Sequence, residues 1–107
     1  MQWQVTFYSH KVELETLSMP PGILANFLHI AEMIEELGPV LGMPYTKALG
    51  KGLFEIRAKG KEGIGRSLFC TVQEREVIIL HSFIKKSNQI PRKELRIARR
   101  RMQEVLS

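Results

Sequence analysis

The stretch that decides the fold is 53-LFEIRAKGKEGIGRSLFCTVQEREVIILHSFIKK-86, which holds three strand-like runs separated by two turns. The runs cover residues 53–59, 66–73 and 77–84, and the turns are the glycine-bearing 60–65 and Glu-Arg-Glu at 74–76. In the first run Phe54, Ile56 and Ala58 alternate with charged residues, which is typical of a half-buried strand. The stretch therefore predicts a meander of three antiparallel strands, one side facing a core and the other presenting cations.

Two segments before the meander have readable patterns. Trp3, Val5 and Phe7 alternate with polar residues, so we expect an N-terminal strand that pairs with the meander. Residues 20–39 begin with two prolines, carry apolar residues at three- and four-residue spacings and end in Gly-Pro, which predicts one long helix. Residues 9–19 suit either a short strand or a turn of helix.

Outside these elements the chain offers a connection and a second helix. Residues 40–52 are rich in Gly and Pro, so we expect a surface connection there. Residues 91–106 combine an apolar docking side with six Lys or Arg, which predicts a basic C-terminal helix. The whole chain, 1–107, is predicted to be one α+β domain: an antiparallel sheet, made of the N-terminal strand and the meander, packed against the long helix.

Charge is unevenly distributed along the sequence. Residues 85–107 contain eight Lys or Arg and two Glu, whereas residues 1–84 contain eight bases and nine acids. A basic end on a balanced domain indicates a polyanion or an acidic protein as partner, although a solvated basic helix gives the same pattern. Cys70 is the only cysteine and no apolar run approaches a bilayer span. We therefore expect a cytoplasmic protein without a membrane partner.

The composition excludes several kinds of chemistry. The chain has no aspartate, one cysteine and three scattered histidines, so neither a magnesium nor a zinc site is expected. The glycines at 60, 63 and 65 do not match a phosphate-binding loop, and no serine-nucleophile elbow is present. We predict that the protein uses no metal and no cofactor.

Metal-independent cleavage of RNA remains chemically accessible. Attack by a ribose 2′-hydroxyl on its phosphate needs a proton acceptor, cations that stabilise the phosphate and a proton donor. The candidates on the meander and at its end are Arg57, Lys59, Arg66, His81 and Lys85. Because side chains alternate along a strand, Arg57 and Lys59 share one face of the sheet, and His81 and Phe83 also share a face. The alternation does not show whether these two faces are the same. Alternatively, Arg57 and Arg66 only pair with Glu55 and Glu62 on a solvated sheet.

Two longer segments resemble a known family. The strings 41-LGMPYTKALGKGLFEIRAKGKEGIGRSLFCTV-72 and 81-HSFIKKSNQIPRKELRIARRRM-102 resemble the phage-derived, HigB-like branch of the RelE/ParE toxin superfamily. The resemblance implies a RelE/ParE-like fold and the toxin of a type II toxin–antitoxin module. It further implies a ribosome-dependent mRNA endonuclease, with mRNA and the ribosome as partners, and a cognate antitoxin of the helix-turn-helix type.

The resemblance also assigns residues. It places Arg57, Lys59 and Arg66 where such toxins keep phosphate-binding or catalytic bases, and His81 and Lys85 on or after the last strand. The expected RNA-binding residues are Lys47, Lys51, Phe83, Lys86, Arg92 and Arg96. The sequence departs from the family because no tyrosine follows Tyr45. Phe83 can stack on a base but cannot move a proton, which leaves Lys59, His81 and Lys85 as alternatives for the general base.

Two other functions fit the same sequence. One is a ParE-like protein that inhibits DNA gyrase without catalysis, and the other is a non-catalytic basic RNA-binding module. Gyrase inhibition would cause DNA damage, and a binding module would bind RNA without cutting it.

Overall fold

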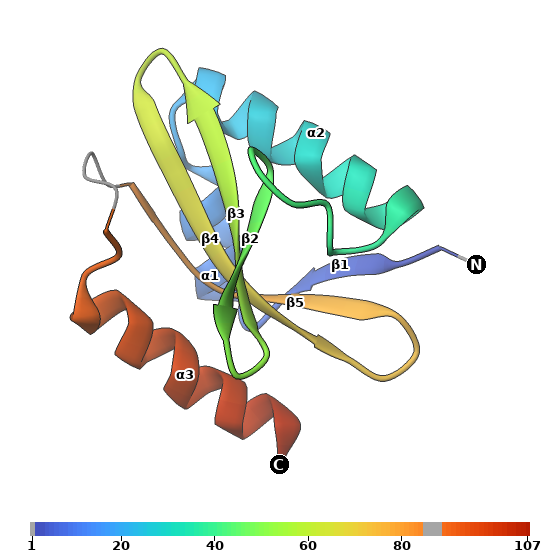
Figure 1. Cartoon of the computed structure of the whole chain (residues 1–107). Helices are drawn as coiled ribbons and strands as arrows, with labels where there is room; N and C mark the ends of the chain where they lie inside the picture. The colour runs from blue at the N-terminus through green and yellow to red at the C-terminus, as the bar shows by residue number, and fades with distance from the viewer. Residues whose placement is uncertain (1, 85–88) are drawn as a thin grey trace.

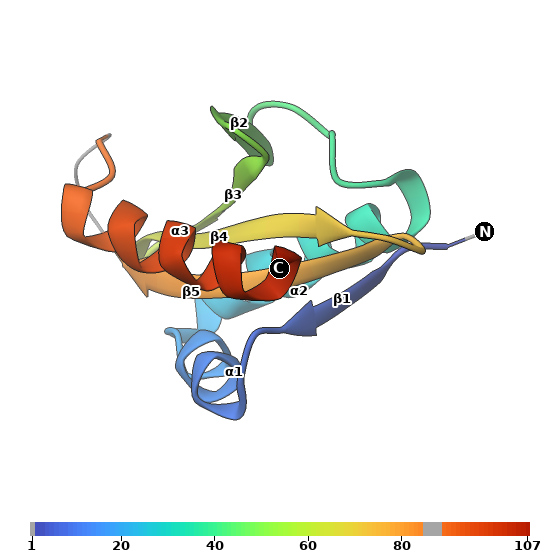
Figure 2. The same cartoon turned by 90° about the horizontal axis from the view of Figure 1, so that it is seen from below.

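The computed structural model describes residues 2–84 and 89–107. Its elements follow the order β1 (Gln4–Phe7), α1 (His10–Leu17), α2 (Pro21–Leu37), β2 (Thr46–Gly50), β3 (Leu53–Gly60), β4 (Gly63–Val72), β5 (Glu76–Ile84) and α3 (Arg92–Leu106). They form three layers, with α1 and α2 on one face of a sheet and α3 on the other (Figure 1, Figure 2). None of the helices in the described part of the chain is long and apolar enough to cross a membrane.

The sheet has the strand order β1-β5-β4-β3-β2. The predicted meander is present as β3, β4 and β5, which pair antiparallel. Two expectations were wrong. The N-terminal strand β1 runs parallel to β5, so the sheet is mixed, and residues 46–50 of the expected connection form the edge strand β2, antiparallel to β3. The segment left open at residues 9–19 contains the helix α1, which Ser9 caps by accepting a hydrogen bond from the Val12 N–H.

Helix α2 supplies the apolar layer on the first face. It starts at Pro21, where the missing N–H costs no hydrogen bond, and ends at Gly38. Its residues Ile23, Phe27, Ile30 and Ile34 recur every three or four positions and are at most 1% exposed. They pack with Val12 of α1 against the apolar side chains of the sheet. Burying each such side chain stabilises the fold by about 1.5–3 kcal/mol.

The β3–β4 hairpin is held against the start of α2. The Glu62 carboxylate accepts a hydrogen bond of 3.0 Å from the Gly22 N–H, and this bond lowers the pKa of Glu62. Gly60 allows the close approach, because a Cβ there would lie 2.5 Å from the Ile23 nitrogen. Glu62 therefore pairs with a helix N-terminus instead of an arginine.

Helix α3 packs on the second face of the sheet, the side on which the alternation in 53–59 places the charged residues. Ala98 and Met102 pack on Leu53, Leu68 and Leu80 of the sheet. Arg101 Nη1 donates a hydrogen bond of 2.8 Å to the Leu80 carbonyl, and its guanidinium lies 5.2 Å from the centre of the Tyr8 ring. The Tyr8 hydroxyl in turn donates to Glu104, and this hydrogen bond raises the pKa of Tyr8. Part of the positive charge of α3 therefore holds this helix against the sheet.

A β-bulge changes which face the end of β5 presents. Phe69 of β4 pairs with Ile79, whereas the preceding residue Leu68 pairs with His81, so Leu80 is the extra residue on β5. Ile79 packs in the core beneath α1 and α2, and Leu80 packs beneath α3. Because one inserted residue inverts the alternation of a strand, the residues after Leu80 face the opposite side from that expected by extending the pattern of Val77 and Ile79.

Candidate functional site

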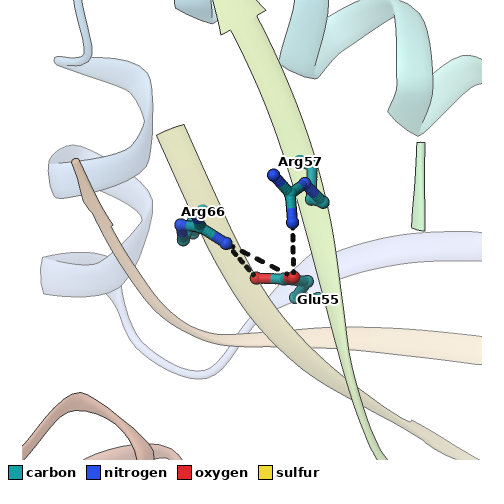
Figure 3. A network of polar contacts seen from close by, with 3 residues as sticks. All are labelled: Glu55, Arg57 and Arg66. Atoms are coloured by element: carbon teal, nitrogen blue, oxygen red, sulfur yellow. Dashed lines mark hydrogen bonds and ion pairs between the residues drawn. The ribbon is translucent and has the colours of Figure 1, made fainter. Parts of the chain in front are cut away.

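Glu55 is the centre of a charged network with Arg57 and Arg66, on the face of the sheet against which α3 packs (Figure 3). Arg66 Nη1 lies 3.1 Å from Glu55 Oε2, and Arg57 Nη1 lies 3.6 Å from Glu55 Oε1. The side chains of Glu55 and Arg66 are 1% and 0% exposed, whereas that of Arg57 is 12% exposed. Arg66 is therefore an internal partner of Glu55, and Arg57 is the arginine of this network that reaches the surface.

The strands bring this network together by register. Arg57 of β3 pairs with Arg66 of β4, which pairs with Phe83 of β5. In the adjacent row, Glu55 pairs with Leu68, which pairs with His81. Residues directly opposite each other in a sheet share a face, so His81 and Phe83 lie on the same face as Arg57. The register thus answers the parity question that the sequence left open.

His81 connects the sheet to the first turn of α3. Its Nε2 lies 2.8 Å from Glu94 Oε1, and its ring centroid lies 5.5 Å from that of Phe83. The Nδ1 atom is enclosed and has no hydrogen-bond partner in the described structure. A carboxylate acceptor at Nε2 favours the tautomer with its proton on Nε2, because the other tautomer would bury an unpaired N–H group at Nδ1.

A hollow of about 450 Å³ opens beside this network. Lys47 of β2 and Arg92 of α3 line it together with Glu55, and both cations are exposed. Apolar and amide side chains complete the wall: Leu49, Gln89, Ile90 and Leu95. The hollow thus combines two cations, which suit phosphate binding, with an aliphatic wall.

A larger hollow of about 580 Å³ lies at the far end of α3. Residues 71–74 of the β4–β5 region line it together with Val105 and Leu106. Glu74 is the charged residue in this lining, so the hollow presents no cation to a phosphate. We therefore locate the candidate site at the hollow that contains Glu55.

The other predicted site residues are distributed around this face. Lys59 follows Arg57 by two positions on the same side of β3 and is exposed, pairing with Ile64. Lys51 is exposed at the β2–β3 turn, with φ of 53°, and Arg96 is exposed on α3. Lys85 and Lys86 lie outside the described residues. The roles assigned to all of these residues stay predictions.

The structural roles of two acids at the site were not predicted from the sequence. Glu55 was recognised only as a surface ion-pair partner, yet it is a buried centre for two arginines. Glu94 was not considered, although it binds His81. The available signal for Glu55 was its position between Leu53 and Arg57 on one side of a strand. Cys70 lies in the core on the α3 side of the sheet, and burial raises the pKa of its thiol.

Comparisons with known proteins agree with this architecture. The model of the family described as phage-derived protein Gp49-like (DUF891) matches residues 15–103. No curated protein sequence gives a significant match. A chain of the archaeal RelE–RelB complex from Pyrococcus horikoshii OT3 aligns with a TM-score of 0.57 at 19% identity, covering 78% of this chain and 96% of the other.

A second solved structure is similar over a longer range. It is the E. coli toxin RelE in the free state, in a variant with two arginines replaced by alanine. It aligns with a TM-score of 0.61 at 12% identity, covering 95% of this chain and 99% of the other. At these identities the likeness concerns the fold, which resembles that of RelE. Since the family model spans most of the sequence, the chain belongs to the Gp49-like family of phage-derived proteins.

Proposed function

We propose that this protein is the toxin of a type II toxin–antitoxin module, of the HigB-like branch, and that it cleaves mRNA on the ribosome without a metal ion. The RelE-like fold and the Gp49-like family support a toxin of this superfamily. The lone, buried Cys70 supports action in the reducing cytoplasm. The observation that carries the proposal is the position of three cations around Glu55. Lys47 and Arg92 line the same hollow as Glu55, and Arg57 forms an ion pair with Glu55.

In this proposal Arg57 binds the scissile phosphate. Its guanidinium is held at one end by Glu55 and is partly exposed, so its remaining N–H groups can donate to two phosphate oxygens. Glu55 and Arg66 act as positioning residues, since both are buried and Glu55 contacts Arg57. Lys47 and Arg92 neutralise neighbouring phosphates, and Phe83 offers a ring for base stacking.

The reaction is an attack of the 2′-oxygen on the adjacent phosphorus, with departure of the 5′-oxygen. The 2′-hydroxyl gives its proton to a base, and the leaving 5′-oxygen takes up a proton. Lys59 is exposed next to Arg57, so its amine can exchange protons with the substrate. His81 has its Nε2 on Glu94 and its Nδ1 enclosed, so it can exchange a proton only after its contact with Glu94 opens. Arg57 stabilises the additional negative charge on the phosphate in the transition state.

The proposed partners are mRNA, the ribosome and a cognate antitoxin of the helix-turn-helix type. A RelE–RelB complex among the similar structures supports the existence of an antitoxin. The excess of cations on α3, six bases against two acids, supports an RNA partner.

The experiment is induced expression in bacteria, followed by mapping of new 5′ ends on a message with a start codon and on the same message without one. We expect cuts within codons of the translated message only. Arg57→Ala should reduce cutting at least about a hundredfold, a loss typical of removing one donor to a developing anion. Lys11→Ala removes an exposed cation from α1 on the opposite face and serves as control. DNA damage without new RNA ends would instead indicate gyrase inhibition and overturn the proposal.

A further inference from the structure

The face opposite the candidate site carries an apolar hollow with an acidic border. It has a volume of about 280 Å³ and lies between β1, α1 and α2. Its apolar lining consists of Val5, Phe7, Leu17, Phe27, Leu28 and Ala31. Leu17 and Leu28 remain 41% and 45% exposed, so large apolar surface on two different helices is left in contact with water at this place.

Charge at the hollow has the opposite sign to that of the site. Glu32 and Glu35 of α2 are part of its lining. The segment 9–39, which contains both helices, has five Glu and one Lys, whereas the α3 segment 92–106 has six bases and two Glu. An anionic ligand such as RNA or an acidic lipid surface is therefore repelled here, and a ligand with cations beside apolar groups is favoured.

The size of the hollow indicates inserted side chains. Its volume lies just below the roughly 300–1,000 Å³ of most small-molecule sites. A helix that presents apolar residues every three or four positions can insert one or two of them between α1 and α2. Lys or Arg residues beside that stripe would then meet Glu32 and Glu35.

We propose that this groove, defined by Leu17, Leu28, Glu32 and Glu35, docks an amphipathic helix of a partner protein whose apolar stripe is flanked by Lys or Arg. A second copy of this chain does not supply such a helix. Its basic helix α3 already buries its apolar stripe, Ala98 and Met102, against its own sheet. The inference is independent of the nuclease activity, and because the groove and the site lie on opposite faces, the partner and RNA bind at the same time.

The test uses two synthetic peptides of about 16 residues, stapled to be helical, with the same leucine stripe. One has Lys on both sides of the stripe and the other has Glu. Fluorescence anisotropy with the full-length protein should show that the Lys peptide binds about tenfold more tightly than the Glu peptide. The double variant Glu32→Lys, Glu35→Lys should reverse this order.

Point variants locate the binding. Leu28→Asp should weaken the Lys peptide at least about tenfold, since it puts a charge into an apolar contact. The matched control is Val40→Asp, at a position that is 79% exposed and not part of the groove. An RNA oligonucleotide should leave the peptide affinity unchanged. No binding of the Lys peptide, equal binding by Leu28→Asp, or a concentration-dependent dimer that excludes the peptide would each overturn the proposal. These binding measurements do not depend on RNA cleavage, so a negative result would not bear on the proposed function.

Discussion

The two faces of the sheet bury their polar side chains in different ways. Beneath α1, Thr16, Ser82 and Ser67 form a chain of buried hydroxyls, with oxygen separations of 2.7 and 2.8 Å. On the face toward α3, the buried polar side chains among the described residues are the ions Glu55 and Arg66. Hydroxyls that bond to one another cost little to bury, whereas each ion loses several kcal/mol of hydration. The difference suggests that the first face serves stability and that the face beneath α3 retains its ions for another purpose.

Removing Glu55 should have the largest effect. Glu55→Ala leaves Arg66 buried without its carboxylate partner, so we expect a loss of about 3–5 kcal/mol in the free energy of unfolding. The double variant Glu55→Leu, Arg66→Met should lose less than the single one, because both buried charges are gone. Urea unfolding followed by circular dichroism measures both variants. A double variant that is less stable than Glu55→Ala would contradict this account of the face beneath α3.

Truncating the core of the other face should affect stability without affecting the site. Phe27 is 1% exposed, so Phe27→Ala should cost about 3–4 kcal/mol through lost burial and a cavity. We expect RNA affinity per folded molecule to stay unchanged at a temperature where the variant is folded. The neighbouring exposed position offers the control, since Leu28→Ala should change stability by about 0.5 kcal/mol or less. A specific loss of RNA affinity in Phe27→Ala would show that the two faces are coupled.

Charge removal on α3 should have a smaller effect, visible in salt dependence. If Arg92 contacts a phosphate, Arg92→Ala should reduce the slope of log affinity against log salt by about 0.7–1. Filter binding of a single-stranded RNA between low and moderate salt gives this slope. Lys11→Ala, on the acidic face, should leave it unchanged. Equal slopes for Arg92→Ala and the wild type would show that Arg92 does not contact an RNA phosphate.

The smallest effect concerns pH and the hairpin anchor at α2. The hydrogen bond from Gly22 lowers the pKa of Glu62 below its usual value of 4.5. This hydrogen bond therefore contributes fully to stability above pH 4.5. The contribution is lost as the pH falls through the pKa that Glu62 has in the folded protein. The melting temperature of Glu62→Gln should lie below that of the wild type at pH 7, and the two should converge as the pH is lowered toward 3. A difference that does not depend on pH would exclude the carboxylate as the cause.

Local patterns were sufficient for the elements with strong periodicity. The meander and helix α2 follow from alternation and from three- and four-residue spacing, and each lies within a few residues of its predicted bounds. Strand β2 was missed because Thr46, Lys47 and Ala48 lie in a Gly- and Pro-rich segment with no long alternating run. Its strand structure depends on pairing with β3. The parallel direction of β1 is set by its pairing with β5 across some seventy intervening residues.

The candidate site depended on two features that the sequence does not display. One is the bulge at Leu80, which puts His81 and Phe83 on the face of Arg57, because a single inserted residue inverts strand parity. The other is the burial of Glu55 and Arg66, on the side of the sheet where the alternation of residues 53–59 indicated a surface of cations. The charged residue types were readable from the sequence, whereas their burial depends on tertiary packing.

The measurement that tests the central claim most directly is cleavage of a ribosome-bound message by the purified protein in buffer with a magnesium level that keeps ribosomes intact. The wild type and Lys11→Ala should generate the same new 5′ ends at the same rate. Arg57→Ala should bind the ribosome but cut at least about a hundredfold more slowly. Unchanged cutting by folded Arg57→Ala would contradict the account, because the partly exposed arginine beside Glu55 would then have no part in the reaction.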